Sequence, residues 1–226
     1  MTTPILLIAN KVYSSWSMRP CILMKELAIP FEEKVVRLRQ ADTGERIREH
    51  AGSGKVPVLI DGDIKVWESI AICEYLAERH PDRGVWPKEV AARAHARAVA
   101  SEMHADFMAL RKDFPFNITR RFAASGLAQD VQADVDRINV IFDEARTRFG
   151  ADGPFLYGAF SAADAMYAPV VARFHTYSIH LDAVAGAYCE TMRNLPSYRA
   201  WVDAACKETW VIEDVERPSP IEDLRA

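Results

Sequence analysis

A strand-to-helix junction near the N-terminus is the strongest constraint on how this chain folds. The apolar run Ile5–Ile8 is typical of a buried strand, and residues 17–28 carry apolar side chains at helical spacing before Pro30. Residues 13–20 join the two and read Tyr-Ser-Ser-Trp-Ser-Met-Arg-Pro. The first turn of a helix has unpaired backbone N–H groups and the positive end of the helix dipole. A serine here therefore either caps the helix or donates to a bound anion such as a thiolate.

The segments that follow complete a small α/β unit. In chain order we expect a strand at 31–38, a short helix within 40–54, a hairpin of 55–60 and 64–67, and a helix at 70–80. The hairpin is indicated by the Asp-Gly turn at residues 61–62, and the last helix ends before Pro81. This order of elements predicts a thioredoxin-like domain over residues 1–81.

Residues 88–226 predict an all-helical domain, so the expected fold class is α/β plus all-α, with a helical bundle in the second half. Helical apolar spacing occurs in 89–112, 128–149, 161–177, 181–193 and 197–207. Phe160 to Asp164 has the pattern of a capping box preceded by an apolar residue, which predicts a helix start.

Three separated motifs carry a resemblance to a known family. They are Ser14 to Arg19, the Lys-Val-Pro run at 55–57, and the Glu-Ser-Ile-Ala-Ile run at 68–72. Together they resemble the cytosolic glutathione S-transferases, most closely the serine-containing zeta, tau and phi classes, in which an Arg follows the active serine by five positions. The late capping box is similar to one in the same family, so the resemblance covers nearly the whole chain. Trp16 stands where zeta enzymes have a cysteine.

The resemblance implies that glutathione is the co-substrate and that residues 55–57 and 68–69 hold it. Ser69, at a helix start, would bind the γ-glutamyl carboxylate, and Glu68 would pair with the ammonium. The backbone of Val56, before a Pro57 that is cis in this family, would pair with the cysteinyl residue. The glycyl carboxylate needs a cation or polar contact, for which the candidates are Lys55 first and then Arg37, Arg39, Arg46, Arg48 and Gln40.

Ser14 and Ser15 are the candidate catalytic residues, because a donor beside the sulfur favours its ionised form. A free thiol has a pKa near 8.5, and one charge-assisted hydrogen bond of about 1.5–3 kcal/mol lowers it by about one to two units. The spacing to Arg19 favours Ser14. Ser17 is a further alternative donor, although its position favours a role as the helix cap. Arg19 either adds positive potential or, as we favour, belongs to an internal ion pair.

The electrophile is expected to bind between the two domains. Tyr13 and Trp16 would face the first long helix of the second domain, which offers Phe107, Met108, Arg111, Phe114 and Phe116. Core packing is the alternative role for each aromatic residue. The mixture favours an apolar electrophile and leaves open an anionic group near Arg111.

The composition limits which kinds of partner this chain is expected to have. With 226 residues, 50% of them hydrophobic, the chain can bury a substantial core, and its formal net charge of −4 gives no electrostatic case for nucleic acid. We expect neither a signal peptide nor a membrane span, and therefore a cytoplasmic protein with no membrane partner.

The four cysteines form no C-x-x-C pair, and the histidines show no metal-ligand spacing, so neither dithiol redox chemistry nor a metal site is expected. Cys21 is interpreted as a buried inert thiol, with a mixed-disulfide role left open.

The leading functional hypothesis is a glutathione transferase that conjugates the thiolate to an electrophilic small molecule. One alternative is a glutathione-dependent cis-trans isomerase of the maleylacetoacetate type, and another is a non-catalytic glutathione-binding protein. The resemblance further implies a homodimer and a role in detoxification.

Overall fold

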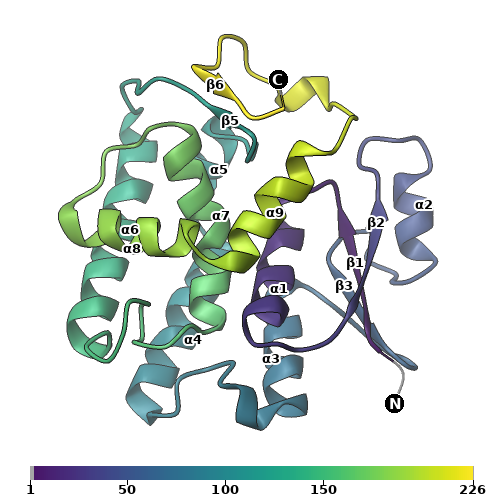
Figure 1. Ribbon diagram of the computed structural model, residues 1–226, viewed down its shortest axis with the longest axis horizontal. Coiled ribbons are helices and arrows are strands. Elements are labelled where there is room, and N and C mark those ends of the chain that lie inside the picture. The colour runs from purple at the N-terminus through teal and green to yellow at the C-terminus, as the bar shows by residue number, and fades with distance from the viewer. Residues whose placement is uncertain (1–2, 226) are drawn as a thin grey trace.

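The computed structural model describes residues 3–225 and places a sheet-containing domain beside a helical one (Figure 1). The elements of the first domain are β1 (Ile5–Ala9), α1 (Ser15–Glu26), β2 (Glu32–Val36), α2 (Thr43–Arg48), β3 (Val58–Asp61), β4 (Ile64–Trp67) and α3 (Ser69–Arg79). These are the elements expected from the sequence, in the expected order.

The sheet has the strand order β2-β1-β3-β4, in which β1 is parallel to β2 and antiparallel to β3. Its apolar residues point alternately to two faces. Leu6 and Ile8 pack into the main core with α1, while Leu7 belongs to a smaller cluster with Ile47 of α2. Figure 1 shows α1 and α3 on the face of the sheet toward the helical domain and α2 on the other face. The predicted thioredoxin-like fold is confirmed.

The second domain is helical, as predicted. Its elements are η1 (Pro81–Arg83), α4 (Val90–Ala105), α5 (Met108–Asp113), α6 (Gln129–Phe149), α7 (Ala162–Thr176), α8 (Ala183–Arg193), α9 (Pro196–Cys206) and η2 (Glu213–Val215). No helix within residues 3–225 has the length and apolar character needed to cross a membrane.

One local prediction for this domain was wrong. The single helix expected over 89–112 is in fact two helices, α4 and α5. Phe107 adopts a left-handed backbone with φ +60°, which interrupts the helix between them. In addition, β5 (Arg120–Arg121) pairs antiparallel with β6 (Glu222–Asp223). The pairing attaches the C-terminal segment to the loop after α5.

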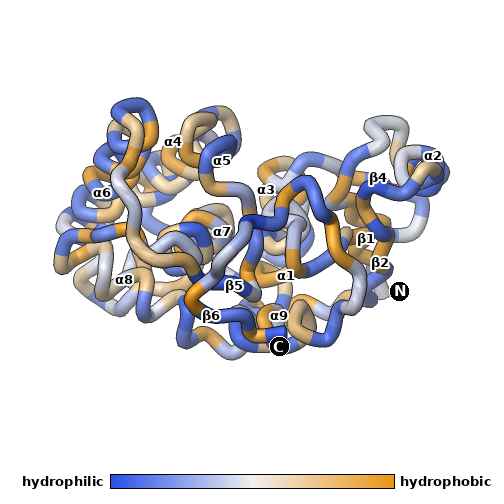
Figure 2. Tube along the Cα trace, turned by 90° about the horizontal axis from the view of Figure 1, so that it is seen from above, coloured by the Kyte–Doolittle hydropathy of each residue, from blue (hydrophilic) through white to orange (hydrophobic). Residues whose placement is uncertain are grey.

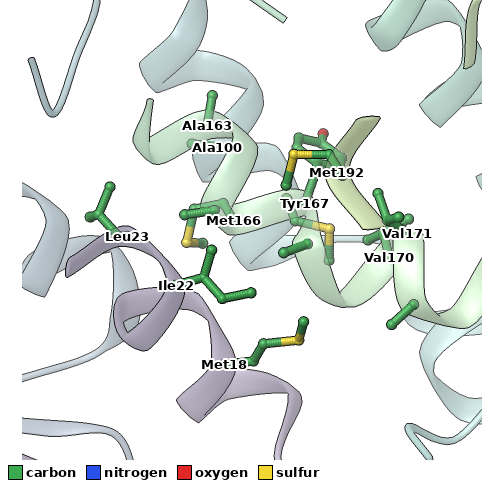
Figure 3. Packing of buried hydrophobic residues seen from close by; sticks show 14 of the residues in the cluster. Met18, Ile22, Leu23, Ala100, Ala163, Met166, Tyr167, Val170, Val171 and Met192 are labelled. Atoms are coloured by element: carbon green, nitrogen blue, oxygen red, sulfur yellow. The ribbon is translucent and has the colours of Figure 1, made fainter. Parts of the chain in front are cut away.

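The two domains share one hydrophobic core, at whose centre α1 packs against α7. Figure 3 shows Ile22 of α1 beside Met166 of α7, with Met18 and Val170 in the same cluster. All four side chains are fully buried. In the view of Figure 2 the two lobes meet along α1, α3 and α7. Burial of this scale, at about 25 cal/mol per Å² of apolar surface, holds the start of α1 at a set position relative to the helical domain.

The predicted capping box at the start of α7 is confirmed. The fully buried Asp164 carboxylate accepts hydrogen bonds from the N–H of Ser161 at 2.9 Å, the hydroxyl of Ser161 at 3.0 Å, the N–H of Leu156 at 3.1 Å and the hydroxyl of Tyr188 at 3.1 Å. One side chain therefore joins the start of α7 to the preceding loop and to α8. Burial raises the pKa of Asp164 to about 6.

Candidate functional site

The first turn of α1 is organised by its serines. Ser14 is the N-cap: its Oγ accepts from the Ser17 N–H at 3.4 Å and donates to the Ser17 hydroxyl at 2.7 Å. Ser17 is fully buried, and its Oγ also accepts from the N–H of Ala9 at 3.0 Å. The interpretation of Ser17 as the cap is therefore wrong. Ser17 instead ties the end of β1 to the helix that follows.

Both candidate catalytic serines lie at this helix start. Ser14 and Ser15 are 6% and 9% exposed, and α1 begins at Ser15. Neither side chain lines the cavity described next, whereas Trp16 does. Their assignment as thiolate donors stays a prediction.

A cavity of about 220 Å³ opens between the two domains, next to the first turn of α1. It is lined by Trp16, Ser53, Lys55, Val56, Pro57, Trp67, Glu68, Ser69, His104 and Arg111. The structure thus brings together every residue predicted to hold glutathione, together with two of those predicted for the electrophile. Ser53, Trp67 and His104 were not identified from the sequence.

The loop before β3 forms one wall. The Val56–Pro57 peptide bond is cis, as the resemblance implied. The ladder between β1 and β3 ends at the Leu7–Val58 pair, so the backbone groups of Val56 lie beyond it. The Lys55 side chain is exposed and has no ion-pair partner within residues 3–225. None of the other candidates for the glycyl carboxylate lines the cavity.

The start of α3 forms a second wall and has the features of an anion site. Glu68, the N-cap, has φ +67°, a backbone conformation that costs a non-glycine residue about 1–3 kcal/mol. Ser69 is 1% exposed, and its Oγ has no hydrogen-bond partner among the described residues. Buried hydroxyls are normally hydrogen-bonded. A carboxylate bound at this helix end would accept from the Ser69 hydroxyl and from the free backbone N–H groups.

His104 of α4 also lines the cavity and lies beside Glu68. Its ring lies 5.1 Å from that of Trp16 between centroids, and its Nε2 lies 3.4 Å from Glu68 Oε2. Burial, together with the nearby Arg19 and Arg111, lowers the pKa of His104 despite the attraction of Glu68. The imidazole is therefore mainly neutral at pH 7.

Arg19 was expected in an ion pair, and that expectation is wrong. The side chain is 1% exposed, and its Nε donates to the Met166 carbonyl at 2.9 Å and its Nη1 to the Ser15 carbonyl at 3.2 Å. Its guanidinium lies 4.0 Å from the ring centroid of Trp16. Within residues 3–225 no carboxylate pairs with it. Arg19 orients Trp16 and the first turn of α1 by hydrogen bonding and cation–π contact.

Tyr13 does not face α4 as expected. Its hydroxyl donates to the Glu216 carboxylate and accepts from Arg225 Nη1 at 3.2 Å. Glu208 meanwhile accepts from the N–H groups of Lys11 and Val12, at 2.7 and 3.2 Å. The C-terminal segment therefore holds the loop that leads to Ser14.

The other residues predicted for the electrophile divide between core and surface. Phe107 is 4% exposed and Met108 is 63% exposed, and neither lines the cavity. Phe114 and Phe116 are buried, as the core-packing alternative predicted. Arg111 and Trp16 lie on the cavity wall, with the Arg111 guanidinium 4.8 Å from the Trp16 ring centroid.

Comparison with known families matches both halves of the chain. The glutathione S-transferase N-terminal domain matches residues 13–79, and the glutathione S-transferase C-terminal domain matches residues 128–204. Together these ranges cover more than half of the chain. The chain belongs to the glutathione S-transferase family.

Individual relatives share less than 40% of their residues with this chain over the aligned regions. A probable maleylacetoacetate isomerase from Caenorhabditis elegans is 38% identical over 87 residues, which are 38% of this chain and 39% of that protein. A glutathione S-transferase from Arabidopsis thaliana is 32% identical over 162 residues, 66% of this chain and 58% of that protein. Both matches span less than two thirds of the relative.

The fold of this family member is similar to solved structures over most of its length. A glutathione transferase homologue from Burkholderia, solved with bound glutathione, superposes with a TM-score of 0.67 at 21% identity. The superposition covers 90% of this chain and 98% of that one. At this identity the likeness concerns the fold.

A second hollow of about 380 Å³ lies elsewhere in this family member, in the helical domain. Its wall includes His175, Arg193 and Tyr198, and it shares no residue with the cavity at the start of α1. None of the motifs that carried the resemblance contributes to it, so we place the candidate site at the cavity between the domains.

Cys21 belongs to the same helix as Ser15 and Trp16 but does not line the cavity, and it is chemically protected. The thiol is fully buried in α1, and its Sγ donates to Glu33 Oε1 at 3.4 Å. Burial, reinforced by the Glu33 charge, raises the pKa of Cys21 to about 12. A thiol with so little thiolate at neutral pH is a poor nucleophile, which agrees with the interpretation of Cys21 as inert.

Proposed function

We propose that this chain is a glutathione transferase that binds glutathione in the cavity between its domains and conjugates the thiolate to an electrophilic small molecule. The observation that carries the proposal is the buried, unpartnered Ser69 hydroxyl at the start of α3, on the wall of a cavity beside the serines of α1. That arrangement provides an anion site on one wall, and Trp16 on the same cavity is next in sequence to the candidate thiolate donors.

Each polar group of glutathione has a partner in this arrangement. The γ-glutamyl carboxylate would accept from Ser69 and the N-terminal N–H groups of α3, and Glu68 would pair with the ammonium. The cysteinyl residue would pair with the backbone of Val56 as an added strand does. Lys55 would face the glycyl carboxylate as the unpaired cation on that wall.

Activation of the thiol falls to Ser14, with Ser15 as the alternative donor. The Ser14 hydroxyl now donates to Ser17, whose Oγ also accepts from the Ala9 N–H. When glutathione binds, the Ser14 hydroxyl would rotate to donate to the sulfur, and Ser17 would keep its bond from Ala9. The positive end of the α1 dipole adds to the stabilisation of the thiolate.

An isomerase remains the second candidate, supported by the similarity to a probable maleylacetoacetate isomerase. The isomerase would use the same thiolate but regenerate glutathione, so net consumption of glutathione separates the two activities. Trp16, in place of the cysteine of zeta enzymes, favours the transferase. A non-catalytic glutathione-binding protein would keep the Glu68–Ser69 site without turnover. Family membership supports a cytoplasmic homodimer with a role in detoxification as further parts of this proposal.

Ser69→Ala and Glu68→Ala are each expected to weaken glutathione binding by about 1–3 kcal/mol, because each removes a hydrogen bond to a charged group. Calorimetric titration of the folded variants measures the change directly. Ser101→Ala is the matched control, since this exposed serine of α4 lies outside the cavity wall, and its affinity should equal that of the parent. Parental affinity in both site variants would contradict the assignment of the α3 end to the γ-glutamyl group.

A further inference from the structure

Three arginines, one on the cavity wall and two buried, act on one another near Trp16. Arg19 and Arg173 are 1% and 5% exposed, and Arg111 is half-buried on the cavity wall. Arg173 Nε donates to the Phe114 carbonyl at 2.9 Å, and Arg111 Nη1 donates to the Asp106 carbonyl at 2.9 Å. Within residues 3–225, none of the three lies within 4.0 Å of a carboxylate oxygen.

The three charges act on one another. Burial lowers the pKa of Arg19, and the charges of Arg173 and Arg111 lower it further. Burial and the Arg111 charge lower the pKa of Arg173 to about 10. Burial lowers the pKa of Arg111, and the charge of Asp106 partly offsets this by raising it. These cations therefore leave a positive potential at the end of the cavity where Trp16 and Arg111 lie.

Glutathione does not use this charge in the proposed binding mode. Its two carboxylates are matched by the start of α3 with Ser69 and by Lys55, which line the wall formed by the first domain. Arg111 comes from α5, in the helical domain, and lies beside Trp16. A neutral electrophile would bury the half-exposed Arg111 guanidinium further without supplying a charge partner, which is unfavourable. A carboxylate would instead pair with the donors that the Asp106 carbonyl leaves free.

From this arrangement we propose that the preferred electrophile carries a carboxylate, and that Arg111 is the residue that selects it. The inference rests on the proposed transferase function of the same cavity. An aromatic or planar body would pack on Trp16 while its carboxylate faces Arg111, and Arg19 and Arg173 would support the negative charge from behind. In the reaction, the glutathione sulfur forms a bond to the electrophilic carbon, and the leaving group departs with its electron pair. The thiol proton passes to solvent.

A pair of probes that differ by one charge tests the proposal. Para-(chloromethyl)benzoate and para-(chloromethyl)benzamide have nearly the same size and the same chloride leaving group. For each probe, kcat/KM is divided by the rate of the uncatalysed reaction with glutathione, which removes the difference in intrinsic reactivity. We expect the parent protein to favour the benzoate by about tenfold or more, the scale of one charge-assisted hydrogen bond.

Arg111→Gln should remove most of this preference, mainly through the KM for the benzoate, while the KM for glutathione stays close to its parental value. Arg111→Lys should retain part of the preference, because it keeps the charge without the bidentate geometry. Lys112→Gln removes one positive charge from the neighbouring exposed residue outside the cavity wall and should keep the full preference.

The outcomes separate this inference from the proposed function. Equal or greater acceleration of the benzamide would overturn the inference while leaving a working transferase. A preference for the benzoate that is unchanged in Arg111→Gln, or a rise only in the KM for glutathione, would also overturn it, since Arg111 would then not bind the electrophile. Failure to bind glutathione or to conjugate either probe would overturn both.

Discussion

Asp164→Ala is expected to lower the free energy of unfolding by about 3–5 kcal/mol, because several buried donors at the start of α7 lose their acceptor together. The N–H groups of Leu156 and Ser161 and the hydroxyl of Tyr188 all donate to this carboxylate. Since α7 packs against α1 at the centre of the shared core, the loss should destabilise both domains. Denaturant unfolding followed by circular dichroism measures it.

Asp143→Ala is the matched control, since Asp143 lies on the exposed face of α6. Its free energy of unfolding should change by less than about 0.5 kcal/mol. An equal change in the free energy of unfolding in the two variants would contradict a stabilising role for the Asp164 hydrogen bonds.

The Asp164 carboxylate should also make the free energy of unfolding decrease as the pH rises. Burial raises the pKa of Asp164 from an ordinary value of 3.8 to about 6 in the folded chain, so the folded state binds the proton more tightly than the unfolded state. The free energy of unfolding of the parent, relative to that of Asp164→Asn, should therefore fall by about 3 kcal/mol as the pH rises from about 4 to above 6. Unfolding curves at several pH values in this window measure the difference. A constant difference would contradict the raised pKa.

Ser14→Ala is expected to raise the pKa of the bound glutathione thiol by about one to two units, because it removes the proposed donor to the sulfur. Turnover near neutral pH should fall about ten- to a hundredfold and recover in part at alkaline pH, where the thiolate forms without help. Affinity for glutathione should change little, since its glutamyl and glycyl ends bind elsewhere. Ultraviolet titration of the bound thiolate and a pH profile of turnover are the measurements.

Parallel variants separate donation to the sulfur from structural roles. Ser14→Ala should also cost about 1 kcal/mol of stability, because Ser14 is the N-cap of α1. Ser17→Ala should lower stability through its lost bond to Ala9 but keep the parental thiol pKa. If Ser15→Ala alone raised the thiol pKa, Ser15 would be the donor. If no serine variant changed it, activation by a hydroxyl would not be the mechanism.

The sequence predicted most of the fold because the signals for these elements are local. The apolar run of β1, the Asp-Gly turn of the hairpin and the capping box of α7 each lie within a few residues. The residues that we propose to bind glutathione could be grouped from the sequence for the same reason. They occur in two short runs, 55–57 and 68–69, whose contacts depend on a strand start and a helix start.

The failed expectations depend on contacts between residues distant in sequence. Tyr13 is held by Glu216, 203 positions away, and Arg19 by the Met166 carbonyl, 147 positions away. His104 and Arg111 lie on two helices separated at Phe107, so no helical spacing connects them in the sequence. The break itself depends on a left-handed backbone at a phenylalanine, a residue that gives no local signal for it.

The central claim is that the cavity between the domains holds glutathione and favours its thiolate. Ultraviolet difference titration of glutathione bound to the parent protein tests this most directly, because thiolate absorbs where the thiol does not. We predict that the bound thiol titrates about one to two pH units below the value of about 8.5 for a free thiol. Saturable binding with titration at the free value would contradict the claim.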